Sequence, residues 1–258
     1  MKLYFISSCK PIKIEQTRII QQNAINSWKW LDIDKEILIF NRDNSIKDLC
    51  NTLKVNIVDN YESSDFYDLP TWRGMRNYLL NIVSNEDLIV WINADIVLDN
   101  SLVKTIQSLK YDYKLNDFIL TGRRTNWHNW FELSEPENIY DINSTDIADE
   151  WPVDYLIFNN QHFLNMPKFY IARMFFDNYL LNIAVNSTDK TIDCTNSIRS
   201  LNQVHLYSDD CDKTYAEWVK DSYYTKEFEI NRNICSPTSN INNCKYQIIL
   251  KDDKVFFK

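Results

Sequence analysis

The chain has 258 residues, 45% of them hydrophobic and 14% aromatic, which is enough apolar material for one large packed domain or two small ones. A net charge of −8 argues against a nucleic-acid surface, and two glycines, Gly74 and Gly122, are too few for a glycine-rich phosphate loop. The six cysteines form no C-x-x-C pair, and no apolar run has the length of a signal-peptide core or a membrane span. We therefore expect a cytoplasmic, reducing setting with no zinc site and no membrane span.

Strand-like and helix-like stretches alternate through the first half of the chain. Buried apolar runs predict strands at residues 2–7, 36–40, 55–58 and 88–92. Apolar residues at helical spacing predict the helices between them, at residues 15–31, 45–53 and 72–83. This alternation predicts an α/β fold whose mostly parallel, Rossmann-type sheet is flanked by helices.

The second half of the chain is less regular, although no repeat or linker divides it from the first. A helix is expected at residues 101–109, followed by a strand at 118–121 and a long aromatic loop at 125–152. Further along, the pattern predicts a strand at 154–158, a helix at 175–185, strands at 191–194 and 198–206, and a hairpin of 246–250 with 254–257. The segment before the hairpin is polar and less regular.

The apolar run at residues 88–92 ends abruptly in Asn93-Ala94-Asp95. Polar side chains at the carboxyl end of a central strand occupy the place where open α/β sheets bind their ligands. Asn93 and Asp95 are two residues apart, so an extended chain points both to one face, and their oxygens suit a hard divalent cation. The alternative is an ordinary turn stabilised by Asn and Asp.

Several short motifs share their order with a known family. They are Gln22-Asn23-Ala24-Ile25-x-Ser27-Trp28, Ile92-Asn93-Ala94-Asp95-Ile96, Gly122-Arg123-Arg124, Asp154-Tyr155-x-x-Phe158, Pro167-x-Phe169-x-x-x-Arg173-x-x-x-Asp177-Asn178-x-Leu180-Leu181, Ile192-Asp193-x-Thr195 and Val204-His205. In this order the sequence resembles a family of glycosyltransferases of the GT-A type, over most of the chain. It departs from the family at Asn93, where the wider superfamily favours Asp, at Ala172 and Phe176, and in residues 206–210, where the family tends to V-H-x-x-H-D-Y.

The resemblance implies a single GT-A-like domain over residues 1–258. Residues 1–124 would form the nucleotide-sugar-binding half, residues 125–206 a smaller acceptor-side sheet and loop region, and residues 207–258 a C-terminal extension. The resemblance also implies Mn²⁺ or Mg²⁺ as cofactor, a nucleotide-sugar donor with a UDP-sugar as first choice, and a glycan or other hydroxyl acceptor. The oligomeric state stays open.

The resemblance assigns chemistry to three residues in particular. Asp95 and His205 would bind the metal ion, and Asp177 would be the catalytic base that an inverting transfer needs. For each of them a structural alternative remains open: a turn residue for Asp95, a structural histidine for His205 and an ordinary first-turn helix acid for Asp177.

Nine further residues are candidates for binding the nucleotide sugar, because they follow predicted strands or match family motifs. They are Ser8, Lys10, Arg42, Asp43, Asn93, Arg123, Arg124, Asp154 and Arg173. For Asn93 a turn-forming role, and for Arg173 a surface ion pair, are equally open. Trp127, Trp130 and Trp151 in the long loop either stack on a sugar ring or pack against one another.

The sequence thus predicts a metal-dependent glycosyltransferase. Two other functions remain open: a sugar nucleotidyltransferase, whose related fold normally carries a glycine-rich loop after the first strand, and a non-catalytic module that binds nucleotides or glycans.

Overall fold

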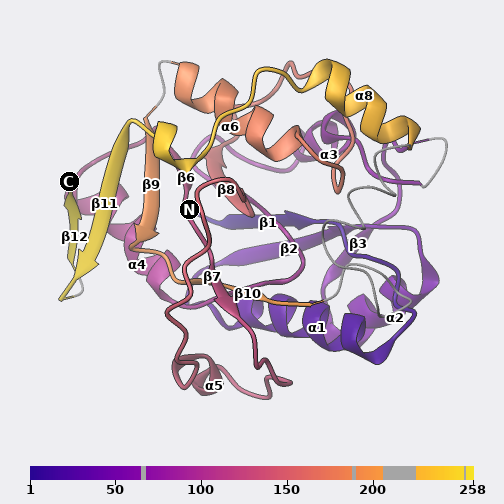
Figure 1. Cartoon of the computed structure of the whole chain (residues 1–258), viewed down its shortest axis with the longest axis horizontal. Coiled ribbons are helices and arrows are strands. Elements are labelled where there is room, and N and C mark those ends of the chain that lie inside the picture. Colours follow the sequence, from indigo (N-terminus) through magenta and orange to yellow (C-terminus); the bar gives the residue numbers. More distant parts are fainter. Residues whose placement is uncertain (65–67, 188–189, 206–224, 253) are drawn as a thin grey trace.

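The structure is a computed structural model that describes residues 1–64, 68–187, 190–205, 225–252 and 254–258 (Figure 1). Within these residues nine strands form one large sheet, in the order β12-β11-β9-β6-β8-β4-β1-β2-β3. Their bounds are β1 Leu3–Ser7, β2 Lys35–Phe40, β3 Asn56–Val58, β4 Leu88–Ile92, β6 Ile119–Thr121, β8 Tyr155–Asn159, β9 Thr191–Asn196, β11 Tyr246–Lys251 and β12 Lys254–Phe257. Most neighbours are parallel; β8 runs antiparallel to β4 and β6, and β12 antiparallel to β11. The predicted fold class and the predicted hairpin are confirmed.

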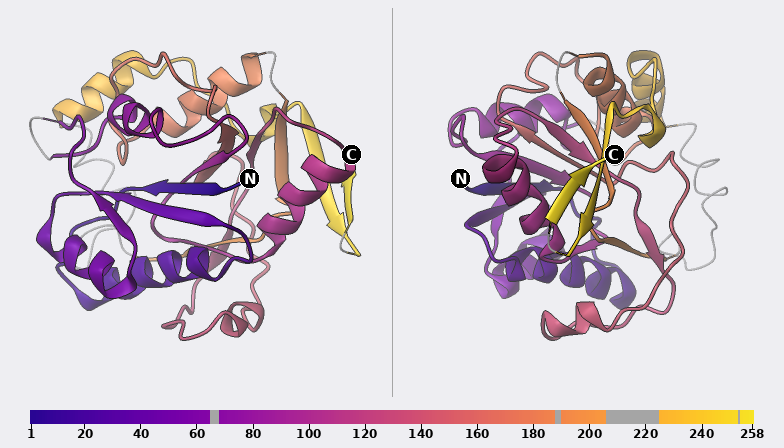
Figure 2. Two further views of the ribbon diagram at one scale, coloured as in Figure 1. Left: turned by 180° about the vertical axis from the view of Figure 1, so that it is seen from behind. Right: turned by 90° about the vertical axis from the view of Figure 1, so that its left-hand side faces the viewer.

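Helices cover both faces of this sheet (Figures 1 and 2). Their bounds are α1 Glu15–Trp30, α2 Asn44–Leu53, α3 Trp72–Leu79, α4 Ser101–Gln107, α6 Phe176–Asn186 and α8 Lys226–Ile234. Alternation along β4 separates the two cores: Leu88, Val90 and Ile92 pack with α1, α2 and α4, whereas Ile89 and Trp91 pack with α3 and α6. Because every residue of β4 is buried, its sequence is a continuous apolar run.

The order of the strands reverses beside β1. The chain leaves β1 through α1 to β2 and β3, then returns through α3 to β4 on the other side of β1. This arrangement creates a topological switch point between β1 and β4, with the carboxyl ends of both strands at the same edge.

A smaller sheet of three strands lies beside α1. It contains β5 Ile96–Leu98, β10 Ser200–Gln203 and β7 Thr125–Trp127, in the order β5-β10-β7. Two side chains of α1 bind β5 directly: the Trp28 indole donates to the Ile96 carbonyl (2.9 Å), and the Ser27 hydroxyl accepts from the Leu98 amide (3.1 Å). The chain therefore changes sheets at Asn93-Ala94-Asp95, between β4 and β5.

Some predicted elements were wrong in detail. The loop expected at 125–152 contains β7 and a short helix α5, Glu137–Tyr140, and the tail contains α8 and the 3-10 helix η2, Ile241–Asn243. The helix expected at 72–83 ends at Leu79, and α4 continues into a π-helical turn, η1 Ser108–Asp112. The strand expected at 198–206 is β10; its predicted end at Leu206, like the family-motif residues 206–210, lies outside the described residues.

Two global features of the described residues bear on the sequence expectations. No helix among them is both long enough and apolar enough to cross a membrane. The five cysteines that the structure describes are Cys9, Cys50, Cys194, Cys235 and Cys244, and all are free thiols.

Candidate functional site

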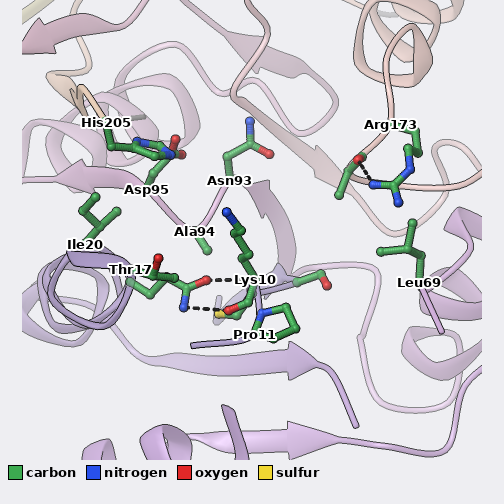
Figure 3. Close-up of a pocket in the computed structure, with 14 residues that line it drawn as sticks. Lys10, Pro11, Thr17, Ile20, Leu69, Asn93, Ala94, Asp95, Arg173 and His205 are labelled. Carbon is green, nitrogen blue, oxygen red and sulfur yellow. Dashed lines mark hydrogen bonds between the residues drawn. The ribbon is translucent and has the colours of Figure 1, made fainter. Parts of the chain in front are cut away.

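A cavity of about 410 Å³ opens at the switch point, beyond the carboxyl ends of β1 and β4 (Figure 3). This is the place where open α/β sheets bind their ligands. Its lining comes from the segment after β1, the first turns of α1, the loop between β3 and α3, the turn after β4, the segment before α6 and the residues just after β10. The lining residues are Ser8, Cys9, Lys10, Pro11, Thr17, Ile20, Gln21, Leu69, Asn93, Ala94, Asp95, Ala172, Arg173 and His205.

The segment after β1 is held in place by side chains from neighbouring elements. Gln21 of α1 binds the backbone of Lys10 twice: its oxygen accepts from the Lys10 amide at 2.6 Å, and its nitrogen donates to the Lys10 carbonyl at 3.0 Å. Asn41 donates to the Cys9 carbonyl at 2.7 Å. These contacts fix the backbone while the exposed Lys10 side chain extends into the cavity with its amino group toward Asn93 (Figure 3).

Asn93 joins the turn after β4 to the start of β8. Its backbone amide donates to the Asp154 carbonyl, and its side-chain amide donates to Asp154 Oδ1, both at 2.9 Å. The guanidinium of Arg124 donates to the same Oδ1 at 2.8 Å. Asp154 is almost fully buried, and its Oδ2 accepts no hydrogen bond within the described part of the chain.

The electrostatics of this cluster are dominated by buried negative charge. Burial raises the pKa of Asp154, Arg124 opposes that rise, and the Asp95 carboxylate adds to it. Carboxylates from two elements thus lie close enough to repel each other, with the guanidinium of Arg124 as the nearest compensating charge. Such an arrangement favours a bound cation beside Asp95.

Asp95 and His205 line the same side of the cavity, opposite Arg173 in the view of Figure 3. Asp95 Oδ1 is buried and accepts no hydrogen bond from any described residue. His205 Nδ1 donates to the Gln203 carbonyl at 2.8 Å, which in the neutral ring places the lone pair that a metal ligand needs on Nε2. These two side chains therefore fit a divalent cation.

A complete protein ligand set is not present in the described residues, where no three His, Cys, Asp or Glu side chains are grouped to hold a metal ion. Asp95 and His205 would supply two ligands, and substrate phosphate oxygens and water would complete the shell, as is usual for Mg²⁺.

Asp177 stands in the first turn of α6, a few residues after the cavity-lining Ala172 and Arg173. Burial raises its pKa to about 7, and the nearby charge of Asp154 contributes to the rise. The residue as a whole keeps some exposed surface, so it is the carboxyl group itself that is buried. A carboxyl group that titrates near neutral pH is suited to accept a proton from a substrate hydroxyl.

The candidate residues fall into three groups. Six line the cavity: Ser8, Lys10, Asn93, Asp95, Arg173 and His205. Three adjoin it through the carboxylate cluster, namely Arg124, Asp154 and Asp177. The remaining three, Arg42, Asp43 and Arg123, line no part of it.

Those three have structural contacts instead. The Arg42 guanidinium donates to the Asp59 and Tyr61 carbonyls (2.7 and 2.6 Å) and pairs with Asp68, and so anchors the loop after β3. Asp43 caps α2 by accepting from the Ser45 amide at 2.9 Å. The Arg123 side chain donates to Asn242 at 2.6 Å.

Two of the three tryptophans are used in packing. Trp127 is buried against Phe131, with ring centroids 5.2 Å apart, and the Trp130 indole donates to the Val204 carbonyl at 2.8 Å. Trp151 is 53% exposed, and its carbonyl accepts from the Asn178 side chain at 2.9 Å, next to Asp177. Only Trp151 therefore offers an exposed face beside the start of α6.

The sequence analysis missed the contribution of α1 to the cavity. Thr17, Ile20 and Gln21 have the spacing i, i+3 and i+4, which places them on one face of the helix. The helix begins directly after the segment that follows β1. The helical spacing together with the expected strand end could therefore have indicated that this face reaches the cavity. Nothing in the sequence pointed to Leu69.

No protein-family model matches the chain, and a comparison with curated proteins gave no match. Solved structures with a similar fold include 4-diphosphocytidyl-2C-methyl-D-erythritol synthase from Anaerococcus prevotii (12% identity, 86% of this chain and 97% of that chain covered, TM-score 0.45). Others are residues 1–349 of S. aureus TarS in complex with UDP-GlcNAc (11%, 92% and 71%, 0.48) and HddC from Yersinia pseudotuberculosis (10%, 78% and 92%, 0.46). With TM-scores below 0.5 these likenesses carry no argument about function, so the reasoning about function rests on the cavity.

Proposed function

We propose that the protein is a glycosyltransferase that moves a sugar from a nucleoside-diphosphate sugar, with a UDP-sugar as first choice, to a hydroxyl acceptor. One domain carries the whole reaction, with the nucleotide-sugar half in residues 1–124 and the acceptor half in residues 125–206. The observation that carries the proposal is the pair Asp95 and His205 at the carboxyl edge of β4, with a buried Asp95 oxygen that accepts no hydrogen bond from the described residues.

The charges around the cavity support a diphosphate in it. Lys10 and Arg173 bring two cationic side chains to its lining, from the segments after β1 and before α6. Mn²⁺ or Mg²⁺ held by Asp95 and His205 would neutralise charge on the diphosphate. Lys10 and Arg173 would orient the phosphates and stabilise the negative charge that grows on them in the transition state.

The carboxyl group of Asp177 supports transfer by inversion. In the reaction the acceptor oxygen forms a bond to the anomeric carbon while the bond from that carbon to the phosphate oxygen breaks, and its electron pair leaves with the diphosphate. The acceptor hydroxyl proton passes to Asp177, whose pKa of about 7 leaves a large ionised fraction at neutral pH. Arg124 and Asn93 hold Asp154 beside it and so fix the charge around the base.

Nucleotide binding tests the proposal first. UDP should bind more tightly with Mn²⁺ than with a chelator, and Asp95→Ala should abolish that difference, measured by calorimetry. Asp48→Ala removes an exposed carboxylate on α2 that lines no part of the cavity, and serves as the matched control. Equal UDP affinity with and without Mn²⁺ in the wild-type protein would contradict the metal site.

Turnover separates the proposed enzyme from its alternatives. A panel of UDP-sugars, with and without chelator, should give metal-dependent release of UDP. Release of pyrophosphate from a nucleoside triphosphate and a sugar phosphate would identify a nucleotidyltransferase instead. Tight UDP binding with neither reaction would identify a binding module.

A further inference from the structure

The buried amide of Gln203, at the end of β10, occupies a central position behind the cavity. The residue has no exposed surface, so each of its polar atoms requires a partner within the protein. Its side-chain nitrogen donates to two carbonyls, those of Ile20 at 2.9 Å and Asp95 at 3.2 Å. Its side-chain oxygen accepts from Asn23 at 2.7 Å.

Gln203 contacts both of the candidate metal ligands. The Asp95 carbonyl accepts from it twice, from the backbone amide at 3.3 Å and from the side chain at 3.2 Å. The Gln203 carbonyl accepts from His205 Nδ1 at 2.8 Å. One residue therefore fixes the backbone that carries the Asp95 carboxylate and also the orientation of the His205 ring.

Asn23 ties this arrangement to the rest of the molecule. It is fully buried in α1, and its side-chain nitrogen donates to Gln203 and to the Phe131 carbonyl, at 2.7 and 2.8 Å. Its side-chain oxygen accepts from the Leu133 amide at 2.8 Å. The helix, the loop after β7 and the end of β10 are thus connected through two amide side chains whose hydrogen-bonding atoms all have partners.

We propose that Gln203 is a positioning residue that sets the geometry of Asp95 and His205 for a divalent cation, with Asn23 as its support. This inference rests on the proposed function for the identity of the cation site. Neutral amides suit the task because they can both donate and accept, and because burying them adds no charge beside the Asp95 carboxylate. Residues that orient metal ligands typically change metal affinity about 10- to 100-fold when they are replaced.

Gln203→Met tests the proposal, because it keeps the length and bulk of the side chain and removes the side-chain bonds to Asn23, Ile20 and Asp95 that hold the Gln203 backbone in place. The backbone bonds to Asp95 and His205 can still form, but their geometry loses this support. Asn202→Leu is the matched control, because it removes a buried amide from the preceding residue of the same strand. The Asn202 side chain lies on the opposite face and, among the described residues, makes one long hydrogen bond, to Asn126 at 3.5 Å. Gln203→Met should lower Mn²⁺ affinity in the presence of UDP about 10- to 100-fold, measured by electron paramagnetic resonance. UDP affinity in chelator should stay as in the wild-type protein.

Histidine NMR gives a second readout that does not depend on the proposed function. The chain has three histidines, so ¹⁵N-histidine spectra are simple, and His205→Gln identifies the His205 signals. Gln203→Met should shift the His205 ring signals and leave those of His128 and His162 unchanged, whereas Asn202→Leu should shift none.

The outcomes separate the two proposals. A wild-type protein that binds UDP equally with and without Mn²⁺ removes the proposed cation site, and the His205 spectra then decide alone whether Gln203 positions the ring. Unchanged Mn²⁺ affinity and unchanged His205 signals in Gln203→Met overturn the positioning role. An equal loss of Mn²⁺ affinity in Asn202→Leu also overturns the positioning role, because the loss of any buried amide from the strand would then have the same effect.

Discussion

Asp177→Asn should separate the chemistry of this carboxyl group from its role in the helix. In the folded protein burial raises the Asp177 pKa from 3.8 to about 7, so ionising the group above neutral pH costs free energy. The asparagine variant has no such cost. It also keeps an oxygen that can accept from the Asn178 amide, as Asp177 Oδ1 does at 2.9 Å.

The size and pH range of the effect follow from that pKa. A rise of about three pKa units corresponds to about 4 kcal/mol at most, at 1.36 kcal/mol per unit, and we expect about 1–4 kcal/mol because water at the exposed part of the residue screens the charge of the buried carboxyl group. Because the folded-state pKa is the higher one, the wild-type protein loses this stability as pH rises from about 4 to about 7. Asp177→Asn should therefore be more stable than wild type at pH 8 and no more stable at pH 4.

Urea unfolding at pH 4, 6 and 8 measures the stability difference, and turnover of a UDP-sugar measures the catalytic one. If Asp177 is the base, kcat of the wild-type protein should rise with pH through about 7, and Asp177→Asn should lose about 10²- to 10⁴-fold in kcat. Asp43→Asn, at the N-cap of α2 and outside the cavity lining, should keep full turnover.

The opposite pattern would refute this reasoning. A simple helix role predicts lower stability of Asp177→Asn at pH 8, by about 0.3–1 kcal/mol, with turnover intact. In that case the base lies elsewhere, or the enzyme retains configuration and needs none.

Three further substitutions test how the site is held. Arg124→Met leaves the buried Asp154 without its cationic partner and should lower the free energy of unfolding in urea by about 3–5 kcal/mol, whereas Arg124→Lys keeps the charge and should lower it by less. Gly122→Ala would place a Cβ 2.5 Å from the Tyr155 hydroxyl and should lower the free energy of unfolding by about 1–3 kcal/mol; an unchanged melting temperature would contradict the close packing there. Arg42→Met should speed hydrogen exchange in the loop after β3 and leave UDP affinity unchanged, because that guanidinium lies outside the cavity lining; weaker UDP binding would return it to the site.

The central sheet could be predicted because its strands are buried on both faces and its helices are amphipathic, and both properties leave a direct pattern in the sequence. The continuous apolar run of β4 is the clearest case. α8 was missed because its side chains are mostly polar, and its core contact depends largely on Phe228. The pairing of Ile96–Leu98 with β10 was also missed, since an apolar run of three residues carries no information about its partner strand.

The sequence could predict only the part of the candidate site that comes from polar residues at the carboxyl ends of strands. The expectation that polar residues at these ends meet in a site holds for Lys10 and Asp95, which line one cavity. It does not hold for Arg42 and Asp43 after β2, because that edge is closed by the loop that Arg42 anchors and by the start of α2. Sequence position indicates which edge of the sheet a residue reaches, but the partner that its side chain finds depends on the folded loops.

The position of Asp95 follows from the change of sheet after β4. A strand that continued straight would keep its backbone groups in the ladder of the large sheet, but here the Asn93 amide bonds to Asp154 of the large sheet and the Asp95 carbonyl bonds to Gln203 of the small one. The turn between them is therefore anchored at both ends by different sheets, and α1 supports the small sheet through Trp28 and Asn23. A loop anchored in this way can hold a half-buried carboxylate whose Oδ1 is buried and accepts no hydrogen bond from the described residues, because the anchored backbone limits how far the side chain can turn toward water. The motif in α1 and the motif at Asp95 are thus physically linked, because the α1 residues support the small sheet and the small sheet in turn anchors Asp95.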